Sequence, residues 1–544
     1  MNYLYYGDNL DVLRRHVKDE SVDLVYLDPP FNSSQDYNVL FDEKNGTRSK
    51  AQIKAFEDTW RWDQFSAEAY QETVEAGGKV ADALRAFRTF LRDSDMLAYL
   101  SMMAPRLVEL RRVLKPTGSI YLHCDPKASH YLKMLMDAVF GPEHFLNEVV
   151  WKRTSAHSSA KRYGPIHDTI LFYRKSDVGF WRGGHQGYDE SYVRQRFSRG
   201  GDRPWKDENL TGAGVRYGET GEVWRGFDVT AKGRHWAYPP TELDRLDAEG
   251  RIYWPNARGG WPRLRVYLDE AKGVSLQDVW TDIPPINSQA GERLGYPTQK
   301  PEALLERIIQ ASSNSGDVVL DPFCGCGTAV SVAQRLGRQW IGIDITHLAI
   351  SLIKARLHDA FGGKAEFKTV GEPTTEADAK TLAAEDPYQF QWWALGLVGA
   401  RPIEERKGAD KGIDGRLYFH EGRAGETKQI VLSVKAGHTH AAHVRDLYGV
   451  ENREKAEIGV LISLEKPTRE MRKEAASAGF YESPWGKHPR LQLLTVRELL
   501  DGKRVDYPPS QQVNVTYKRA PRAKGKKAEQ ISMTLPAGGV RSDE

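Results

Sequence analysis

The sequence predicts an α/β fold built on a doubly wound parallel sheet, with a second, smaller α/β unit toward the C-terminus. Residues 22–27, VDLVYL, form a near-continuous apolar run, which is typical of a parallel strand that is buried on both faces. A second apolar run leads into DPFCGCG at 321–327, where a strand passes into a glycine-rich turn and then a helix. Strand and helix patterns alternate around both segments, and this alternation favours a parallel sheet covered by helices.

The composition is that of a globular protein. The 544-residue chain is long enough for about two to four domains of roughly 150 residues each. Its hydrophobic fraction is 40%, and no apolar run approaches the ~18 residues of a membrane span. The first residues, MNYLYYGDNLDVL, lack the pattern of a signal peptide, and three cysteines do not make a disulfide framework. We therefore expect a cytoplasmic protein with no membrane partner.

The first block, residues 1–150, contains two predicted strands with a helix-rich insertion between them. The strand at 22–27 is followed by a helix-rich stretch at about 50–110 and then by the strand GSIYLHC. The segment ASHYLKMLMDAVFG then has the apolar spacing of an amphipathic helix that ends at Gly141.

The second block, residues 151–295, is rich in loops, and its part up to residue 275 is dense in Lys, Arg, Trp and Tyr. Basic side chains interleaved with aromatic rings suit a phosphate backbone and unstacked bases, although solvated surfaces also show this composition. Residues 296–370 return to the α/β pattern. They contain the helical PEALLERIIQASS, the strand and turn described above, the helix TAVSVAQRLG and the strand QWIGIDI.

Polar groups follow both apolar strands at the point where each strand ends. DPPF at 28–31 contains two prolines, which cannot continue a β ladder, so the chain leaves the sheet with an acid and an aromatic ring at its edge. The turn at 321–327 ends another strand, and Asp344, about 20 residues on, could bind ribose hydroxyls. Doubly wound sheets bind ligands at this edge, but a glycine-rich turn alone leaves NAD and other nucleotides open.

Four motifs, taken together, resemble the amino-group DNA methyltransferases that use S-adenosylmethionine. DPPF at 28–31 looks like their catalytic motif, and DPFCGCGT at 321–328 looks like their cofactor motif. YPTQKPEALLERII at 296–309 is similar to the segment before the cofactor motif, and YGDNLDVL at 6–13 resembles the strand end near the cofactor's adenine. The catalytic motif comes first, as in the permuted β class, which includes the modification subunits of Type III restriction systems. The resemblance covers about residues 1–365 and implies a Rossmann-like methyltransferase sheet with an inserted target-recognition region.

The implied activity is site-specific methylation of an exocyclic amino group on a base flipped out of double-stranded DNA. Such a nitrogen is a poor nucleophile, because its lone pair is delocalised into the ring. Asp28 and the carbonyl of Pro29 can each accept one N–H bond, and these bonds strengthen as positive charge develops on the nitrogen. Asp28 also offers a route for the departing proton, Pro30 helps to fix the turn, and Phe31 offers a ring for the base.

Asp28 at the first position of the motif favours adenine N6 as the methylated group, because cytosine-N4 members of this family usually carry Ser there. Methylation of cytosine N4 stays open. A second alternative is a restriction endonuclease whose methylase half supplies recognition and protection. A third is a binding module with silent sites, against which the intact motifs argue. The sequence names no base-reading residue, and it does not decide whether the chain forms a homodimer.

The resemblance also implies the residues that hold S-adenosylmethionine. The methionine and ribose portions would lie against Asp321, Phe323, Gly325 and Gly327. The ribose hydroxyls would bind Asp344, and the adenine amino group would lie near Asp8. The methionine carboxylate would lie near Thr298 and Lys300. A cationic lysine suits a carboxylate, and acids suit hydroxyl and amino donors. The turn carries Cys326 where Ser is common and Ala329 where Thr is frequent; since both are small, we expect binding to be retained.

The C-terminal part shows a different pattern. After a polar stretch at 371–385, which we expect to be a linker, residues 386–508 form a separate α/β unit. Asp414 precedes a strand that carries Ser433 and Lys435, which share one face of the strand and can approach the same ion as the acid. This pattern resembles the Mrr-like branch of the PD-(D/E)xK nucleases, in which the acid binds Mg²⁺ and the lysine activates water.

Two departures put nuclease activity in doubt. Ser433 stands where Glu or Gln is usual, and Gln391 stands at a frequent position of a helix acid. We therefore expect weaker Mg²⁺ binding at Asp414 unless Glu404, Glu405 or Asp410 compensates. Both an active nuclease and an inert DNA-binding descendant stay open. Residues 509–544 include YKRAPRAKGKK, are short of apolar side chains, and are predicted to form a disordered basic tail.

Overall fold

The protein is seen here in a computed structural model. The structure describes residues 1–30, 62–154, 163–200, 202–256, 260–287, 290–294, 296, 298–402, 412–420 and 427–508. The chain divides into two compact units, which are described separately. The first contains Met1–Arg182 and Asp278–Ala523, and the described residues of the second are Gly183–Gln277.

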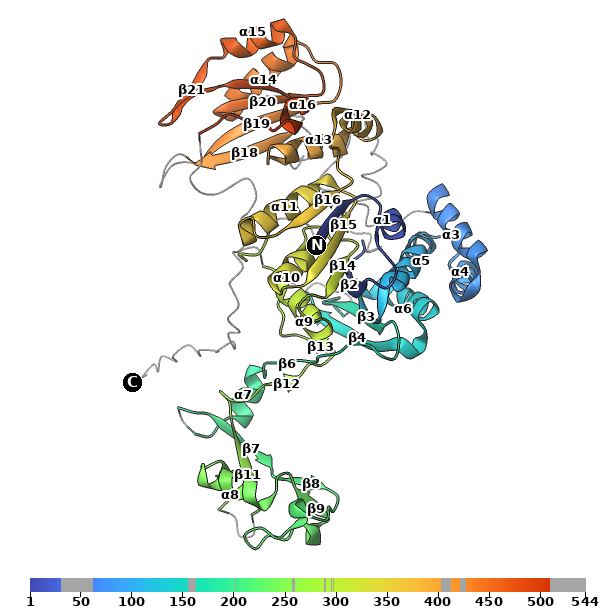
Figure 1. Ribbon diagram of the computed structural model, residues 1–544, viewed down its shortest axis with the longest axis vertical. Helices are drawn as coiled ribbons and strands as arrows, with labels where there is room; N and C mark the ends of the chain where they lie inside the picture. The colour runs from blue at the N-terminus through green and yellow to red at the C-terminus, as the bar shows by residue number, and fades with distance from the viewer. Residues whose placement is uncertain are drawn as a thin grey trace. The chain divides into compact units, whose positions relative to one another are not determined.

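A nine-stranded sheet forms the centre of the first unit (Figure 1). Its strand order is β13-β4-β5-β3-β2-β14-β15-β1-β16, and neighbouring strands are parallel except at β5, which is antiparallel to both β3 and β4. In chain order the strands are β1 (Asn2–Tyr6), β2 (Val22–Leu27), β3 (Leu114–Cys124), β4 (Phe145–Lys152), β5 (His167–Arg174), β13 (Val279–Trp280), β14 (Val318–Asp321), β15 (Gln339–Asp344) and β16 (Phe367–Val370). This sheet confirms the predicted fold class.

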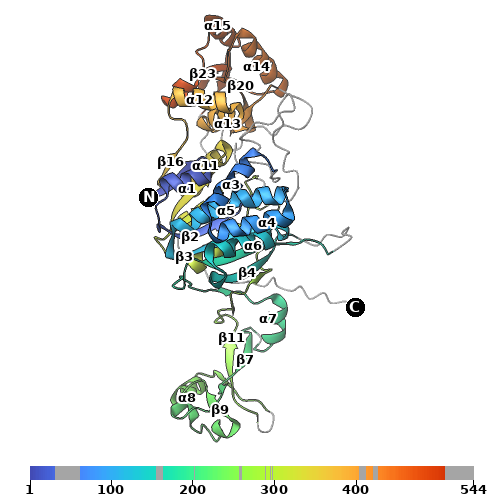
Figure 2. The ribbon, with the colours of Figure 1, turned by 90° about the vertical axis from the view of Figure 1, so that its right-hand side faces the viewer.

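Helices cover both faces of this sheet (Figure 2). The helices on one face are α1 (Asn9–His16), α3 (Gln64–Ala76), α4 (Gly78–Leu91), α5 (Asp95–Val113) and α6 (Pro126–Phe140). Those on the other face are α9 (Glu302–Ser312), α10 (Thr328–Arg335) and α11 (His347–Phe361). Side chains of β2 alternate between the two layers, with Val25 and Leu27 in the first core and Leu24 and Tyr26 in the second.

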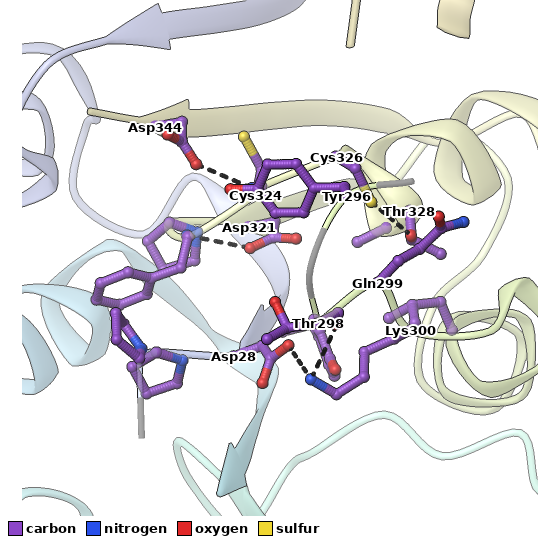
Figure 3. Close-up of a pocket in the computed structure, with 18 of the residues that line it drawn as sticks. Asp28, Tyr296, Thr298, Gln299, Lys300, Asp321, Cys324, Cys326, Thr328 and Asp344 are labelled. Atoms are coloured by element: carbon purple, nitrogen blue, oxygen red, sulfur yellow. Dashed lines mark hydrogen bonds and ion pairs between the residues drawn. The ribbon is translucent and has the colours of Figure 1, made fainter. Parts of the chain in front are cut away.

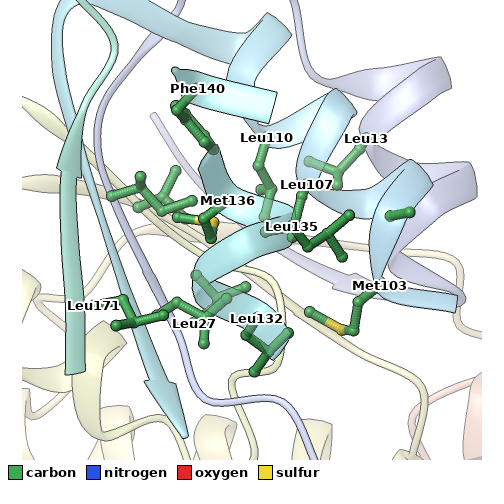
Figure 4. Packing of buried hydrophobic residues seen from close by; sticks show 14 of the residues in the cluster. Leu13, Leu27, Met103, Leu107, Leu110, Leu132, Leu135, Met136, Phe140 and Leu171 are labelled. Carbon is green, nitrogen blue, oxygen red and sulfur yellow. The ribbon is translucent and has the colours of Figure 1, made fainter. Parts of the chain in front are cut away.

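The packing of α6 shows why the sequence folds in this way. Asp125 caps the helix by accepting a hydrogen bond from the backbone N–H of Ala128, and Gly141 ends it with a φ of 92°, which favours glycine. Its apolar stripe, with Leu132 and Leu135, packs with α5 and the sheet in a core that excludes water (Figure 4). The amphipathic spacing read from the sequence is therefore the face that holds this layer on the strands.

The second unit has short strands and its own core. A three-stranded sheet has the order β10-β11-β7, and two ribbons pair β12 with β6 and β8 with β9. Its elements are β6 (His185–Gln186), α7 (Glu190–Arg196), β7 (Trp205–Asn209), β8 (Thr211–Ala213), β9 (Arg234–Trp236), α8 (Pro240–Ala248), β10 (Ile252–Tyr253), β11 (Arg263–Tyr267) and β12 (Val274–Ser275). Trp224, Trp236 and Leu243 are buried in this core, so part of the tryptophan content serves packing.

The C-terminal part of the first unit contains a five-stranded sheet in the order β17-β18-β19-β20-β23. Its strands are β17 (Arg401–Pro402), β18 (Gly415–His420), β19 (Thr427–Lys435), β20 (Ile458–Ser463) and β23 (Leu491–Thr495). A hairpin joins β21 (Phe480–Ser483) to β22 (Gly486–Pro489). The helices are α12 (Glu376–Glu385), α13 (Pro387–Leu397), α14 (Ala441–Glu454), α15 (Arg469–Ser477) and α16 (Val496–Leu500).

One expectation is wrong in this region. Most of the polar stretch at 371–385, expected to be a linker, folds as α12, whose Ala379 and Ala383 are buried in the same core as Trp393 of α13. A capping box at Thr375 and Asp378 starts this helix. Two buried alanines on its inner face pack it against the core that includes α13. The predicted basic tail at 509–544 lies outside the described residues. Within the described part of the chain, no helix has the length and apolar character needed to cross a membrane.

Candidate active site

A cavity of about 370 Å³ opens where the carboxyl ends of β1, β2, β14 and β15 meet (Figure 3). Its lining brings together segments that are far apart in the sequence. The predicted residues among its lining are Asp8, Asp28, Pro29, Pro30, Thr298, Lys300, Asp321, Phe323, Gly325 and Asp344. Phe31 lies outside the described residues, and Gly327 lies in the same turn as Gly325, between the lining residues Cys326 and Thr328.

The carboxylate of Asp28 is paired with Lys300 inside this cavity. The ammonium group of Lys300 donates to Oδ2 of Asp28 and lies 3.5 Å from the backbone carbonyl of Thr298. Both side chains are largely buried, with 17% of Asp28 and 11% of Lys300 exposed, so water screens the pair only weakly. The resemblance implies a place for Lys300 near the methionine carboxylate, whereas its partner in this structure is the predicted catalytic acid.

Thr298 has a backbone conformation that its residue type rarely adopts. Its φ is 63°, in the left-handed region that is unfavourable for a β-branched residue. This conformation directs the Thr298 carbonyl toward the ammonium group of Lys300 in the cavity. Strained residues of this kind persist where the surrounding structure holds them, and they occur often at functional sites.

Asp344 joins the end of β15 to the glycine-rich turn. Its Oδ2 accepts a hydrogen bond from the backbone N–H of Gly325 at 2.9 Å, and its Oδ1 accepts from the N–H and the hydroxyl of Thr346, both at 2.9 Å. Burial raises the pKa of Asp344 to about 6, although these hydrogen bonds act in the opposite direction. A carboxylate offers about four acceptor positions, so one is left for a hydroxyl donor in the cavity.

The second buried acid at this edge is Asp321, at the end of β14. It is 4% exposed, and its Oδ1 accepts from the backbone N–H of Phe323 at 3.1 Å. Burial raises the pKa of Asp321 well above its usual value, and the nearby negative charges of Asp28 and Asp344 add to this effect. These three acids line one cavity together with Asp8 and Asp168, and such a site suits a ligand that offers hydrogen-bond donors or positive charge.

The turn at 325–327 needs glycine for two reasons. Gly325 and Gly327 have φ values of 47° and 72°, in the left-handed region. A Cβ atom on Gly325 would lie 3.1 Å from the ring of Tyr296, and one on Gly327 would lie 2.7 Å from Cγ1 of Ile353. Glycine is therefore required at both positions by the backbone conformation and by close packing against Tyr296 and Ile353.

Asp8 is placed by a network that the sequence did not reveal. It caps α1, with its Oδ1 accepting from the N–H of Leu10, and its Oδ2 accepts from Nη2 of Arg106 at 2.8 Å. Nε of the same guanidinium donates to Asn9, whose amide donates at 2.8 Å to the carbonyl of Pro322 in the turn after β14. The available signal was a lone arginine in the apolar run of α5, where Arg106 is 6% exposed.

The C-terminal residues predicted from the nuclease pattern also come together. Oδ2 of Asp414 accepts from the hydroxyl of Ser433 at 3.0 Å and from the N–H of Val434 at 2.6 Å, and Nζ of Lys435 lies 3.6 Å away. Asp414 is the one carboxylate in this group. Over the described ranges, no cluster of three or more His, Cys, Asp or Glu side chains is arranged to hold a metal ion.

Two family models match different parts of this chain. Residues 22–355, more than half of the chain, match the family model of the N6/N4 type described as DNA methylase. The chain belongs to this DNA methylase family. Residues 388–501 match a second model, described as NACHT-associated inactive restriction endonuclease 1. The predicted resemblance to both families is confirmed, while Mg²⁺ at Asp414 finds no support, because the second model is of an inactive type.

Individual relatives agree with the family. The Type II methyltransferase M.EcaI of Enterobacter cloacae is 30% identical over 357 residues, which cover 65% of this methylase and 69% of the relative. The Mod subunit of the Type III restriction-modification enzyme StyLTI from Salmonella typhimurium is 29% identical over 402 residues, 70% of this chain and 57% of that subunit. A solved structure of a putative DNA modification methylase from Thermus thermophilus with S-adenosyl-L-methionine covers 68% of this chain and 100% of that one, at 17% identity and a TM-score of 0.32.

The glycine-rich turn of this methylase yields a direct test. Gly327→Ala should lower the free energy of unfolding in two ways: a left-handed backbone costs an alanine about 1–2 kcal/mol, and the new methyl group collides with Ile353. Gly316→Ala is the matched control, because Gly316 has a φ of 91° with open space around it. Urea denaturation should show a clearly larger loss for Gly327→Ala. Equal losses in the two variants would contradict the close packing of this turn against α11.

Proposed function

We propose that this chain is an S-adenosylmethionine-dependent DNA methyltransferase that methylates the exocyclic N6 of an adenine flipped out of double-stranded DNA. The observation that carries the proposal is the meeting of two motifs: the turn after β2 and the glycine-rich turn after β14 line one cavity. The family includes N6 and N4 members, and Asp28 at the head of the DPPF turn favours adenine. Cytosine N4 is the alternative target, and it would use the same site.

Asp28 and Pro29 act on the amino group of the base. Its nitrogen becomes nucleophilic when its two N–H bonds are drawn out of the ring plane, and the Asp28 carboxylate and the Pro29 carbonyl can each accept one of them. Lys300 already occupies Oδ2 of Asp28, so Oδ1 is the oxygen left for the amino group, and the ion pair holds the carboxylate in place. As positive charge grows on the nitrogen, both bonds strengthen, which lowers the barrier selectively in the transition state. Asp28 then takes the proton that the nitrogen releases.

The residues around the glycine-rich turn fit S-adenosylmethionine. The cavity of about 370 Å³ is within the usual range for a small-molecule site, Gly325 of the turn lines it, and Asp344 retains one acceptor position for a ribose hydroxyl. Asp8 and Asp321 add acceptors for the amino groups of the cofactor. When bound, the cofactor supplies a methyl group on a positively charged sulfur. This positive charge suits a cavity in which aspartates outnumber lysine and arginine among the described lining residues.

We place this activity in a restriction-modification setting, because the relatives named above are a Type II methyltransferase and a Type III Mod subunit. Target recognition would fall to the second unit, whose basic and aromatic side chains suit DNA; Tyr217, for example, is 96% exposed. The cytoplasmic location stays a prediction, and the formation of a homodimer stays open.

The first test measures the methylated base. Unmethylated DNA incubated with the protein and S-adenosylmethionine should yield N6-methyladenine in nucleoside mass spectrometry, and Asp28→Asn should lower the rate by at least about 100-fold without weakening cofactor binding. Asp23→Asn is the matched control, since Asp23 lies on the same strand and pairs with a lysine outside the cavity. N4-methylcytosine would contradict the choice of base. No methylated base, with cofactor binding intact, would count against the proposal.

Asp344 should make cofactor affinity depend on pH. Its carboxylate must be ionised to accept a ribose hydroxyl fully, and its pKa is about 6. Affinity for S-adenosylhomocysteine should therefore be constant above this pKa and fall by up to about 10-fold per unit as the pH drops below it. Isothermal titration calorimetry at several pH values would measure the affinity of the wild-type protein and of Asp344→Asn. The variant should bind more weakly and lack this pH dependence. The same pH dependence in the variant would remove Asp344 from this role.

We further propose that the C-terminal domain does not cleave DNA. Ser433 replaces the usual second metal ligand, and the hydrogen bonds from Ser433 and Val434 occupy Oδ2 of Asp414. Among the described residues of this site Asp414 is the one carboxylate, and such a site should hold Mg²⁺ poorly, because this ion prefers several oxygen ligands. Plasmid DNA incubated with the protein and Mg²⁺ should stay supercoiled. Cleavage that requires Mg²⁺ and disappears in Lys435→Ala would contradict this proposal.

A further inference from the structure

A row of buried side chains crosses three neighbouring strands beside Asp28. The hydroxyl of Tyr26 on β2 lies 2.9 Å from Nδ1 of His123 on β3, and Nε2 of His123 lies 3.2 Å from Oδ2 of Asp168 on β5. The three residues are 2%, 0% and 2% exposed. Asp28 follows the end of β2, two residues after Tyr26, and lines the same cavity. Tyr26 and Asp168 both line the cavity.

Asp168 determines which nitrogen of His123 carries the proton. Burial by itself would raise the pKa of Asp168, but the hydrogen bond with His123 and the positive charges of Lys300 and Arg153 outweigh it and lower the pKa. Nε of Arg153 lies 3.0 Å from Oδ1 of Asp168, at the mouth of the row. An ionised carboxylate can only accept hydrogen bonds, so Nε2 of His123 must be the protonated nitrogen.

This assignment decides the direction of the next hydrogen bond. In the neutral imidazole, which is the form that our proposal assigns to His123, Nδ1 has only a lone pair and accepts a hydrogen bond from the Tyr26 hydroxyl. Burial raises the pKa of Tyr26 well above its usual value, and the negative charges of Asp28, Asp321 and Asp168 raise it further, so the hydroxyl keeps its proton. With that proton directed to His123, the oxygen of Tyr26 offers only lone pairs to any other group in the cavity.

We propose that Asp168 and His123 are positioning residues that hold the Tyr26 hydroxyl as an additional hydrogen-bond acceptor in the pocket for the amino group of the base. This inference rests on the proposed function and deepens it. The lone pairs of Tyr26 add to the field of Asp28 and the Pro29 carbonyl around a nitrogen that becomes positive in the transition state. The row also keeps the Tyr26 proton away from Asp28, whose free oxygen is needed for the amino group. Arg153 balances the charge of Asp168 at the other end.

The reverse arrangement shows what the row prevents. If Nδ1 of His123 carried the proton, Tyr26 would accept that bond and its own proton would be free to turn to a carboxylate. Asp28 is the cavity carboxylate two residues further along the chain, and a donor directed to it would compete with the amino group. A neutral residue at position 168 would allow this reversal, because the amide group of an asparagine can donate to Nε2.

The decisive experiment compares Tyr26→Phe with Tyr121→Phe in single-turnover methyl transfer. Tyr121 is the matched control: it lies on β3, is 2% exposed, and loses a buried hydrogen bond of 2.6 Å to Ser312 outside the cavity. Tyr26→Phe should lower the rate by about 10-fold, the effect of losing one hydrogen bond to the transition state, with cofactor affinity and melting temperature close to those of the control. Tyr121→Phe should keep the wild-type rate. Equal rates for the two variants would overturn the inference.

A spectroscopic measurement reads the row itself. ¹⁵N NMR of histidine-labelled protein, with the His123 signal assigned by its absence in His123→Gln, should show the proton on Nε2 in the wild type and on Nδ1 in Asp168→Asn. Asp168→Asn should slow methyl transfer as Tyr26→Phe does, and the double variant should be no slower than either, because both act through one oxygen. A wild-type proton on Nδ1, or additive losses, would overturn the inference. A wild-type protein that binds the cofactor and methylates no DNA would instead overturn the proposed function, and this inference with it.

Discussion

The parallel pairing of β2 with β14 is the constraint on which the rest of the site depends. Leu24 is in register with Val319 and Val25 with Leu320, so two segments separated by almost three hundred residues end at the same edge of the sheet. Parallel strands deliver their carboxyl ends to one side, and the turns that follow them must leave the sheet there. Because of this register, Asp28 and the glycine-rich turn line one cavity, although the second unit is inserted between them in the chain.

Electrostatics then decides what this cavity can hold. Asp321 and Asp344 are taken out of water, and burial raises the pKa of both acids. The backbone N–H groups of Phe323 and Gly325 donate hydrogen bonds to these acids and offset part of the free energy lost on burial. These bonds connect both acids to the glycine-rich turn. Asp28 is compensated differently, by the ammonium group of Lys300. A cavity with more acids than cations suits a ligand that has a positive centre, and its cations can accommodate a carboxylate as well.

The methylase part and the C-terminal part differ in the number of acidic side chains that come together at their sites. In the methylase part, the turn after β2, the glycine-rich turn after β14 and the acids beside them line one cavity. In the C-terminal part Asp414, Ser433 and Lys435 lie together, and among the described residues around them Asp414 is the one carboxylate. The core of that domain is nevertheless complete, with Phe390, Trp393 and Ile430 buried. Its fold is therefore maintained by packing that does not depend on metal chemistry.

The sequence by itself determined the strands, the helices and the chemical nature of both turns, because these follow from local patterns. The apolar run at 22–27, the prolines that end it and the glycines at 325 and 327 act on their immediate neighbours in the chain. The prediction of a linker at 371–385 was wrong, because two small side chains of that polar segment are buried in the core.

Only the tertiary structure decided the partners of the charged groups. Lys300 on Asp28, Arg106 on Asp8 and His123 between Tyr26 and Asp168 join positions from 45 to 272 residues apart. Nothing in a linear pattern sets these pairs, because they depend on how distant elements are brought together. For Tyr26, His123 and Asp168, which lie on strands, a register shift by one residue would turn each side chain to the opposite face of the sheet. The sequence thus determined which chemistry is present, and strand register decided which groups act on one another.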